Sequence, residues 1–219
     1  MAEVKNSVMG NISGRIGNMV FWGKNSKQFI SSRPRHYKAS KSKAAKTGRN
    51  NFALRVKLAK LINSIPVLKE IWSNAKVDGT DSYHRIMKYN SKSIKEGSLT
   101  VSTKITPKGL FLSLSSASIQ NDILQLTFTF QQNTNIKFPL ALYIFFYFKE
   151  YGKSVYSISE KIESASPDGS YSLNIGLNSI IKKAIKKDLS PIIYISLAGL
   201  VSYKRKIYWS DTASTRIEP

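Results

Sequence analysis

From Gly97 onward, the sequence divides into short β-type runs separated by turn residues, and this pattern constrains the fold more than any other feature. Eight such runs occur within about 115 residues, with turn signals such as TPKG, QQNTN, SPDG and YKRK between them. Many short strands with little helix among them are typical of an antiparallel sandwich. The runs are residues 98–105, 109–116, 123–130, 139–148, 154–159, 171–178, 191–203 and 206–211.

Two of these runs indicate which residues form the core. Leu124, Leu126, Phe128 and Phe130 alternate with polar residues, as expected for a strand with one buried face. Residues 138–148 (FPLALYIFFYF) are continuously apolar, which favours a fully buried strand. This run is well short of the roughly 20 residues that a membrane helix needs. The residues predicted to be largely buried are Phe128, Phe130, Leu142, Ile144, Phe146, Tyr194 and Ile195.

Before Gly97, the pattern predicts three helical segments. The first begins near Ser40 or Ser42, and its apolar stripe is predicted at Phe52, Val56, Ala59 and Ile62. Pro66 ends or kinks this helix, and VLKEIW continues as a short second segment. A third helix, SYHRIMKY, is predicted to be capped by Thr80 or Asp81 and to stop at Asn90 or Ser91. Residues 179–187 are predicted to form one or two helical turns between strands.

The net charge of +21 is concentrated in the N-terminal half. Residues 1–96 contain 20 Lys and Arg against 5 Asp and Glu, and no acid occurs between Glu3 and Glu70. A stretch of this kind repels itself and attracts polyanions. We therefore predict a sequence-independent contact with a DNA or RNA backbone, or with an acidic protein surface. The predicted polyanion-binding residues are Arg15, Lys24, Lys27, Arg33, Arg35, Lys38, Lys41, Lys43, Lys46 and Arg49.

The segment GNISGRIGNMVFWGK, residues 10–24, has four glycines and two adjacent aromatic residues. Its spacing matches neither dinucleotide-binding nor P-loop motifs, which argues against a phosphate-cradling loop. Two brief strands joined by GKNS predict a hairpin. The predicted assembly anchors are Gly14, Gly17, Val20, Phe21 and Trp22, with the glycines giving tight turns and close approach. The alternatives are a disordered basic tail, or aromatic rings that dock on the protein's own helices.

Few residues are suited to catalysis or metal binding. The chain has no cysteine, and its two histidines, His36 and His84, are far apart in sequence. Asp81 lies three residues before His84, a spacing that favours helix capping over a catalytic pair. We therefore predict no enzyme activity, catalytic residues, metal, cofactor or small-molecule substrate. The N-terminus also lacks the apolar run of a secretory signal peptide.

The order of motifs resembles an uncharacterised domain-of-unknown-function family of Bacteroidetes. The shared features are a G-x-x-G-x-x-V-[FYW] segment, a basic Arg-Pro pair, an Arg-x-x-Phe helix, a Tyr-Asn helix ending and a β-rich C-terminal half. Where the family usually has a Pro-x-x-Ala-Gln entry to the first long helix, this chain has residues 41–45 (KSKAA). The glycine-spaced segment is similar to segments near the start of some phage structural proteins. The resemblance implies no activity. The motif residues are Gly14, Gly17, Val20, Phe21, Arg33, Pro34, Arg49, Phe52, Tyr89, Asn90 and the Pro107–Leu110 segment.

The sequence thus predicts an α+β protein in three parts. Residues 1–40 form a basic arm with a short hairpin, residues 41–96 a small helical segment, and residues 97–219 an antiparallel immunoglobulin-like β-sandwich. The predicted function is that of a non-enzymatic structural or assembly protein, for example of a phage virion-like kind, whose arm docks on neighbouring subunits or a polyanion. The alternative is a sequence-independent nucleic-acid-binding accessory protein of a nucleoid or ribonucleoprotein. The expected location is the cytoplasm or a virion or other assembly, with no membrane span.

Overall fold

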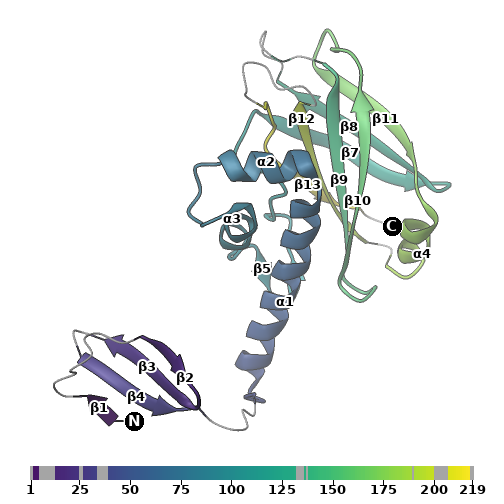
Figure 1. Ribbon diagram of the computed structural model, residues 1–219. Coiled ribbons are helices and arrows are strands. Elements are labelled where there is room, and N and C mark those ends of the chain that lie inside the picture. The colour runs from purple at the N-terminus through teal and green to yellow at the C-terminus, as the bar shows by residue number, and fades with distance from the viewer. Residues whose placement is uncertain are drawn as a thin grey trace. The chain divides into compact units, whose positions relative to one another are not determined.

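The computed structural model describes residues 2–4, 13–24, 27–33, 39–131, 136, 138–188, 190–199 and 207–217. The chain divides into two units, residues 1–42 and residues 43–219, and each is described by itself. No helix among the described residues is long and apolar enough to span a membrane. The α+β class predicted from the sequence is confirmed, because helices and antiparallel sheets are both present (Figure 1).

The N-terminal unit is a four-stranded antiparallel sheet rather than a hairpin alone. The predicted hairpin is confirmed, because Trp22 pairs with Phe29 and Lys24 with Lys27. A second turn, at Gly17 and Asn18, joins another strand to it, and Gly17 has φ +57°, a value that favours glycine. The strand order is β1–β4–β3–β2, with β1 at Ala2–Val4, β2 at Gly14–Ile16, β3 at Met19–Lys24 and β4 at Lys27–Ser32.

The larger unit begins with three helices at the predicted places: α1 (Lys43–Ser64), α2 (Pro66–Asn74) and α3 (Ser82–Tyr89). Pro66 occupies the first turn of α2, where its missing N–H costs no hydrogen bond. Asp81 caps α3, since its carboxylate accepts a 2.8 Å hydrogen bond from the backbone N–H of His84.

The predicted apolar stripe of α1 is wrong in its first half. Leu54, Leu58, Ala59 and Ile62 are buried, whereas Phe52 is 57% exposed. The buried stripe is therefore rotated around the helix relative to the predicted one, and Phe52 lies at its edge. No residue of α1 before Leu54 is buried.

Two antiparallel sheets follow. One has the order β10–β9–β12–β13 and the other β11–β8–β7, while β5 and β6 form a small two-stranded sheet. A short helix, α4, lies between β11 and β12, where one or two helical turns were predicted. The bounds are β5 Ile94–Lys95, β6 Ser98–Leu99, β7 Leu112–Gln120, β8 Ile123–Phe130, β9 Leu140–Phe148, β10 Ser154–Ile162, β11 Ser170–Gly176, α4 Ser179–Ile185, β12 Ile192–Gly199 and β13 Ala213–Arg216.

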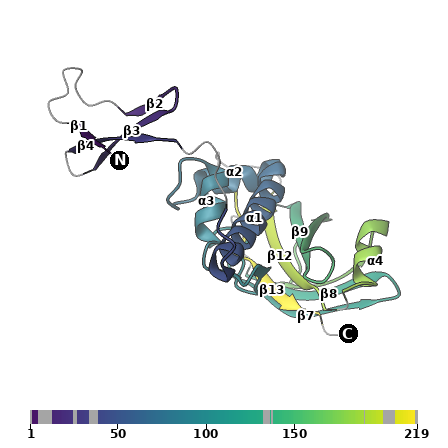
Figure 2. The ribbon, with the colours of Figure 1, turned by 90° about the horizontal axis from the view of Figure 1, so that it is seen from below.

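Strand β9 is the centre of the unit, and all nine of its residues are buried. Its even-numbered residues, such as Leu142 and Phe146, join the core shared with β7, β8 and β11. Its odd-numbered residues, such as Phe145 and Tyr147, join a second core shared with α1, α2 and α3. Figure 2 shows the resulting layers, with α1, α2 and α3 on one side of β9 and β12 and the strands β7 and β8 on the other. The continuous apolar run was therefore correctly read as a strand covered on both faces.

All seven residues predicted to be largely buried are buried. Two predicted runs, however, are mostly not strands. Residues 98–105 contribute only the two-residue β6, and in the run 206–211 the described residues form no strand longer than isolated bridges at Trp209 and Ser210. The strand that was missed is β13, because its sequence ASTR has no apolar alternation. It pairs instead with the edge of β12.

A cluster of buried hydroxyls joins the loop after β6 to the segment before β13. The hydroxyl of Thr212 accepts hydrogen bonds from the backbone N–H groups of Ile105 and Thr106, both at 3.0 Å. The hydroxyl of Thr106 donates to the backbone carbonyl of Ser210 at 2.9 Å. Segments more than 100 residues apart in sequence are thereby fixed to each other.

Candidate functional site

The N-terminal sheet presents apolar side chains on both of its faces. Residues that pair across antiparallel strands lie on the same face. Trp22 stacks on its partner Phe29 on one face, with ring centroids 4.7 Å apart. Phe21 lies on the other face opposite Ile30. None of the described side chains of residues 13–33 is buried. The described side chains of this unit therefore form no closed core.

The predicted glycine anchors act through backbone conformation. Gly14 has φ +126° and Gly17 has φ +57°, both in the region that favours glycine. A Cβ added at either position would meet no atom within 4 Å. The predicted turn at Gly17 is confirmed. The predicted close approach to another surface remains a prediction.

The predicted polyanion-binding residues fall in both units. In the N-terminal unit, Arg15 lies in β2 and donates to the carbonyl of Gly17 at 2.8 Å, and Arg33 follows β4. Arg35 and Lys38 lie outside the described residues. The remaining predicted residues are Lys24 and Lys27, which pair across β3 and β4, Lys41, which precedes α1, and Lys43, Lys46 and Arg49, which lie in α1.

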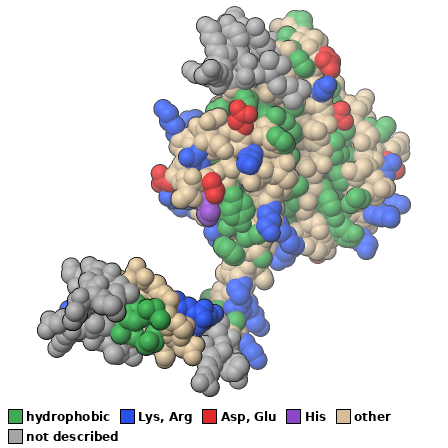
Figure 3. Space-filling view, viewed as in Figure 1, with side chains coloured by type: hydrophobic (Ala, Val, Ile, Leu, Met, Phe, Trp, Pro, Cys, Tyr) green, Lys and Arg blue, Asp and Glu red, His purple; other side chains and the backbone are tan. Residues whose placement is uncertain are grey.

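Helix α1 extends this set beyond the predicted residues. Its 22 residues include six Lys and Arg and no Asp or Glu. Lys46, Arg49, Lys57 and Lys60 are all exposed, and their helical spacing places them together on a side that faces away from the buried stripe. We call these four residues the α1 basic face. Figure 3 shows Lys and Arg side chains gathered along this helix. The sequence signal for Lys57 and Lys60 was their helical spacing from Arg49.

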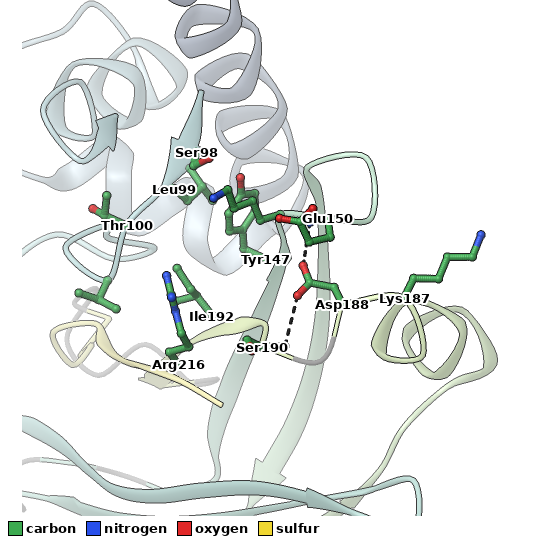
Figure 4. A pocket seen from close by; sticks show the side chains of 12 residues that line it. Ser98, Leu99, Thr100, Tyr147, Glu150, Lys187, Asp188, Ser190, Ile192 and Arg216 are labelled. Carbon is green, nitrogen blue, oxygen red and sulfur yellow. Dashed lines mark hydrogen bonds between the residues drawn. The ribbon is translucent and has the colours of Figure 1, made fainter. Parts of the chain in front are cut away.

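A pocket of about 610 Å³ in the larger unit was not anticipated from the sequence. Four separate parts of the chain line it (Figure 4): β6 with the turn after it, the end of β9 with the turn after it, residues between α4 and the start of β12, and β13. No local motif could have indicated it, because each segment contributes only a few lining residues. Its lining residues are Ser98, Leu99, Thr100, Val101, Tyr147, Lys149, Glu150, Lys187, Asp188, Ser190, Ile192 and Arg216.

The pocket contains an ordered carboxylate and lies beside two buried phenols. The Asp188 carboxylate accepts hydrogen bonds from the backbone N–H groups of Glu150 at 2.9 Å and Ser190 at 3.2 Å. The hydroxyl of Tyr194 donates to the carbonyl of Thr100 at 2.9 Å. Burial raises the pKa values of Tyr147 and Tyr194 above their ordinary value of 10.0, so both remain neutral donors near neutral pH.

The histidines give no support for a catalytic pair. His36 lies outside the described residues. His84 is exposed, and its ring nitrogen lies 2.9 Å from the same Asp81 oxygen that caps α3. Hydrogen bonds from His84 hold the pKa of Asp81 below its ordinary range. In the part of the chain that the structure describes, no three His, Asp or Glu side chains are grouped as metal ligands would be.

No family model matches the sequence, and no curated protein matches it. The resemblance to the Bacteroidetes family therefore remains a prediction.

Proposed function

We propose that the protein is a non-enzymatic assembly protein whose N-terminal sheet docks on a neighbouring protein subunit. The observation that supports this is a four-stranded sheet with apolar residues on both faces and no buried side chain among those described. Covering either apolar face with another surface would remove apolar area from water and so stabilise the sheet. The MVFW run of β3 is typical of a strand covered on both faces.

The chemistry of the partner follows from the charge of the sheet. Residues 1–42 contain eight Lys and Arg and one Glu, so a second copy of the same sheet would repel it. The partner surface is therefore acidic around an apolar patch. Burying one large apolar side chain contributes roughly 1.5–3 kcal/mol. Phe21 and Trp22 lie on opposite faces, so each can be buried by a different contact.

The larger unit would supply the rigid body of this assembly protein, and we propose that its two sheets form an immunoglobulin-like sandwich. Counted from β7, the first, second and fifth strands (β7, β8 and β11) form one sheet. The third, sixth and seventh strands (β9, β12 and β13) lie in the other. This grouping is that of an immunoglobulin constant domain. The one difference is the fourth strand, β10, which pairs with β9 instead of joining β11.

The docking proposal is tested by purifying the tagged full chain from its native source after nuclease treatment. We expect a protein partner to be retained in stoichiometric amount and to rebind when purified separately. Phe21→Ala with Trp22→Ala should release that partner at both low and physiological salt, because apolar contacts are not screened by salt. Phe52→Ala with Phe111→Ala is the matched control, since these two exposed aromatic residues lie in the other unit.

Three results would contradict the docking proposal. In the first, the purified chain is monomeric and retains no other protein. In the second, both double variants bind the partner as strongly as the original chain does. In the third, the partner is retained without nuclease but lost after nuclease treatment. That result would support the second candidate function instead.

That second candidate is sequence-independent nucleic-acid binding, favoured by the α1 basic face. Neutralising Lys46, Lys57 and Lys60 together should weaken binding of a short mixed-sequence DNA duplex. It should also lower the slope of log affinity against log salt by about 0.9 for each phosphate that the variant no longer neutralises. Lys161→Gln, Lys183→Gln and Lys186→Gln remove the same charge at exposed positions of the larger unit and should have a smaller effect. If the two triple variants weakened DNA binding equally, the net charge of the chain, and not the α1 basic face, would be the cause.

A further inference from the structure

The pocket beside β9 has an apolar floor with opposite charges at its two sides. Leu99 and Ile192 are buried and line it together with the ring of Tyr147. Figure 4 shows Arg216 on one side of Ile192 and Tyr147, and Glu150 with Asp188 on the other. The charges come from segments far apart in sequence, so the fold itself separates them.

The positive side presents a guanidinium group. Arg216 is exposed at the pocket mouth, and its charge is close enough to lower the pKa of Tyr194, against the larger effect of burial. A guanidinium group binds a carboxylate through two parallel hydrogen bonds. Lys149 also lines the pocket, but it directly precedes Glu150 in the chain and is not part of the side formed by Arg216. Lys187 is different, since its ammonium group lies 5.1 Å from the ring centroid of Tyr151 and points away in Figure 4.

The negative side is held in place by the backbone. Both oxygens of the buried Asp188 carboxylate accept backbone N–H groups, one from Glu150 and one from Ser190. These bonds fix the Asp188 carboxylate, and Figure 4 shows the exposed Glu150 side chain on the same side of the pocket. Two negative charges on one side of the pocket would attract an ammonium group.

A buried hydroxyl in the pocket lining also lacks a partner. Tyr147 is 1% exposed, and among the described residues no group is in hydrogen-bond geometry to its hydroxyl. Ser98 and the backbone of Leu99 lie near enough to oppose the rise in its pKa, but they do not complete a bond. The hydroxyl oxygen itself has almost no exposed surface, so a molecule in the pocket would contact the ring of Tyr147 and not its hydroxyl.

We propose that this pocket binds a small dipolar molecule, with a carboxylate group against Arg216, an ammonium group against Glu150 and Asp188, and an apolar body over Leu99 and Ile192. Free amino acids and short apolar peptides have this chemistry. A pocket of about 610 Å³ is large enough for a dipeptide. Binding would be independent of the N-terminal unit.

The test uses isothermal titration calorimetry of the full chain with three matched probes: leucyl-leucine, its N-acetyl derivative and its C-terminal amide. The free dipeptide should bind, and each blocked form should bind about tenfold or more weakly, since each forms one charge-assisted hydrogen bond fewer. Arg216→Gln should weaken the free and acetylated probes but not the amide. Glu150→Gln should weaken the free and amidated probes but not the acetylated one.

Two further variants separate the site from the fold. Tyr147→Phe keeps the ring that forms part of the floor and removes a hydroxyl that is buried out of the ligand's reach, so binding and folding should both be kept. Lys183→Gln, at an exposed position of α4 outside the pocket lining, removes one positive charge as Arg216→Gln does and should leave binding unchanged. Near-uniform binding of all three probes, equal binding of the free and acetylated probes, or no binding at all would each overturn the proposal.

Discussion

Strands β3 and β9 share a sequence signature but differ in their surroundings. Both contain continuous apolar runs, MVFW in β3 and LALYIFFYF in β9. Every residue of β9 is buried between the helices and the second sheet, whereas β3 has no buried side chain among those described. An apolar run thus predicts that a strand is covered on both faces, but not whether its own chain provides the cover. We therefore expect a partner protein to bind at β3 and not at β9.

The largest test of this comparison replaces one aromatic residue in each strand. Phe145→Ala in β9 should lower the free energy of unfolding by about 3–5 kcal/mol, because it leaves a cavity in the core under the helices. Phe21→Ala in β3 should lower it by less than about 1 kcal/mol in the isolated chain. Urea unfolding measures both. Equal losses would show that β3 is already covered in the isolated chain.

Two glycines, one in each unit, should show the same contrast between the units with smaller losses of stability. Gly169, in the larger unit, has φ +71°, and a Cβ there would lie 2.7 Å from the carbonyl oxygen of Phe130. Gly169→Ala should therefore cost about 2–3 kcal/mol, from both backbone strain and collision. Gly17→Ala should cost only about 1 kcal/mol, since its added Cβ meets nothing. Thermal unfolding followed by circular dichroism measures both, and the reverse order would refute the contrast.

Alkaline pH should destabilise the larger unit through the buried phenols beside β9. Below about pH 10, Tyr194 is protonated in both the folded and unfolded chain. Above that pH, the unfolded phenol ionises while burial keeps the folded one protonated, so the free energy of unfolding falls.

The variant Tyr194→Phe should lose about 1 kcal/mol near neutral pH, with its hydrogen bond to Thr100, but should decline less steeply above about pH 10. Urea unfolding at a series of pH values measures this, with the exposed Tyr89→Phe as control. An unchanged alkaline slope in Tyr194→Phe would rule out this phenol as the cause.

The smallest expected effect is at Phe52. Because its side chain is 57% exposed, Phe52→Ala should change the free energy of unfolding by less than about 0.5 kcal/mol. Leu58→Ala, at a buried position on the same helix, should cost about 2–5 kcal/mol. Chemical denaturation of the two variants decides whether the predicted stripe or the observed one faces the sheet.

The α1 stripe shows where sequence reasoning was limited. Spacing of three and four residues identified the helix and correctly placed Ala59 and Ile62, but it allowed two neighbouring stripes. The choice between them depends on the shape of the sheet face, which no local pattern contains. The cap at Asp81 and the alternation around Phe128 were predictable because their causes are local.

The candidate sites also differ in whether the sequence could predict them. The anchors Phe21 and Trp22 and the cations of α1 were visible in the sequence, because they are close together along the chain. The pocket was not, since Tyr147, Glu150 and Arg216 meet only when β9 and β13 take their places at either side of β12. The strand β13 was itself missed, so its arginine could not be placed.

The hydroxyl cluster of Thr106 and Thr212 has a consequence for how the larger unit forms during synthesis. Its hydrogen bonds join segments more than 100 residues apart, and such non-local contacts slow folding because a long loop must close first. While the ribosome still holds residues 207–217, β12 has no β13 beside it and the loop at Thr106 has no hydroxyl to bind. The exposed edge of β12 is then open to pairing with other nascent chains, so β13 also protects the sheet from aggregation once it pairs with β12.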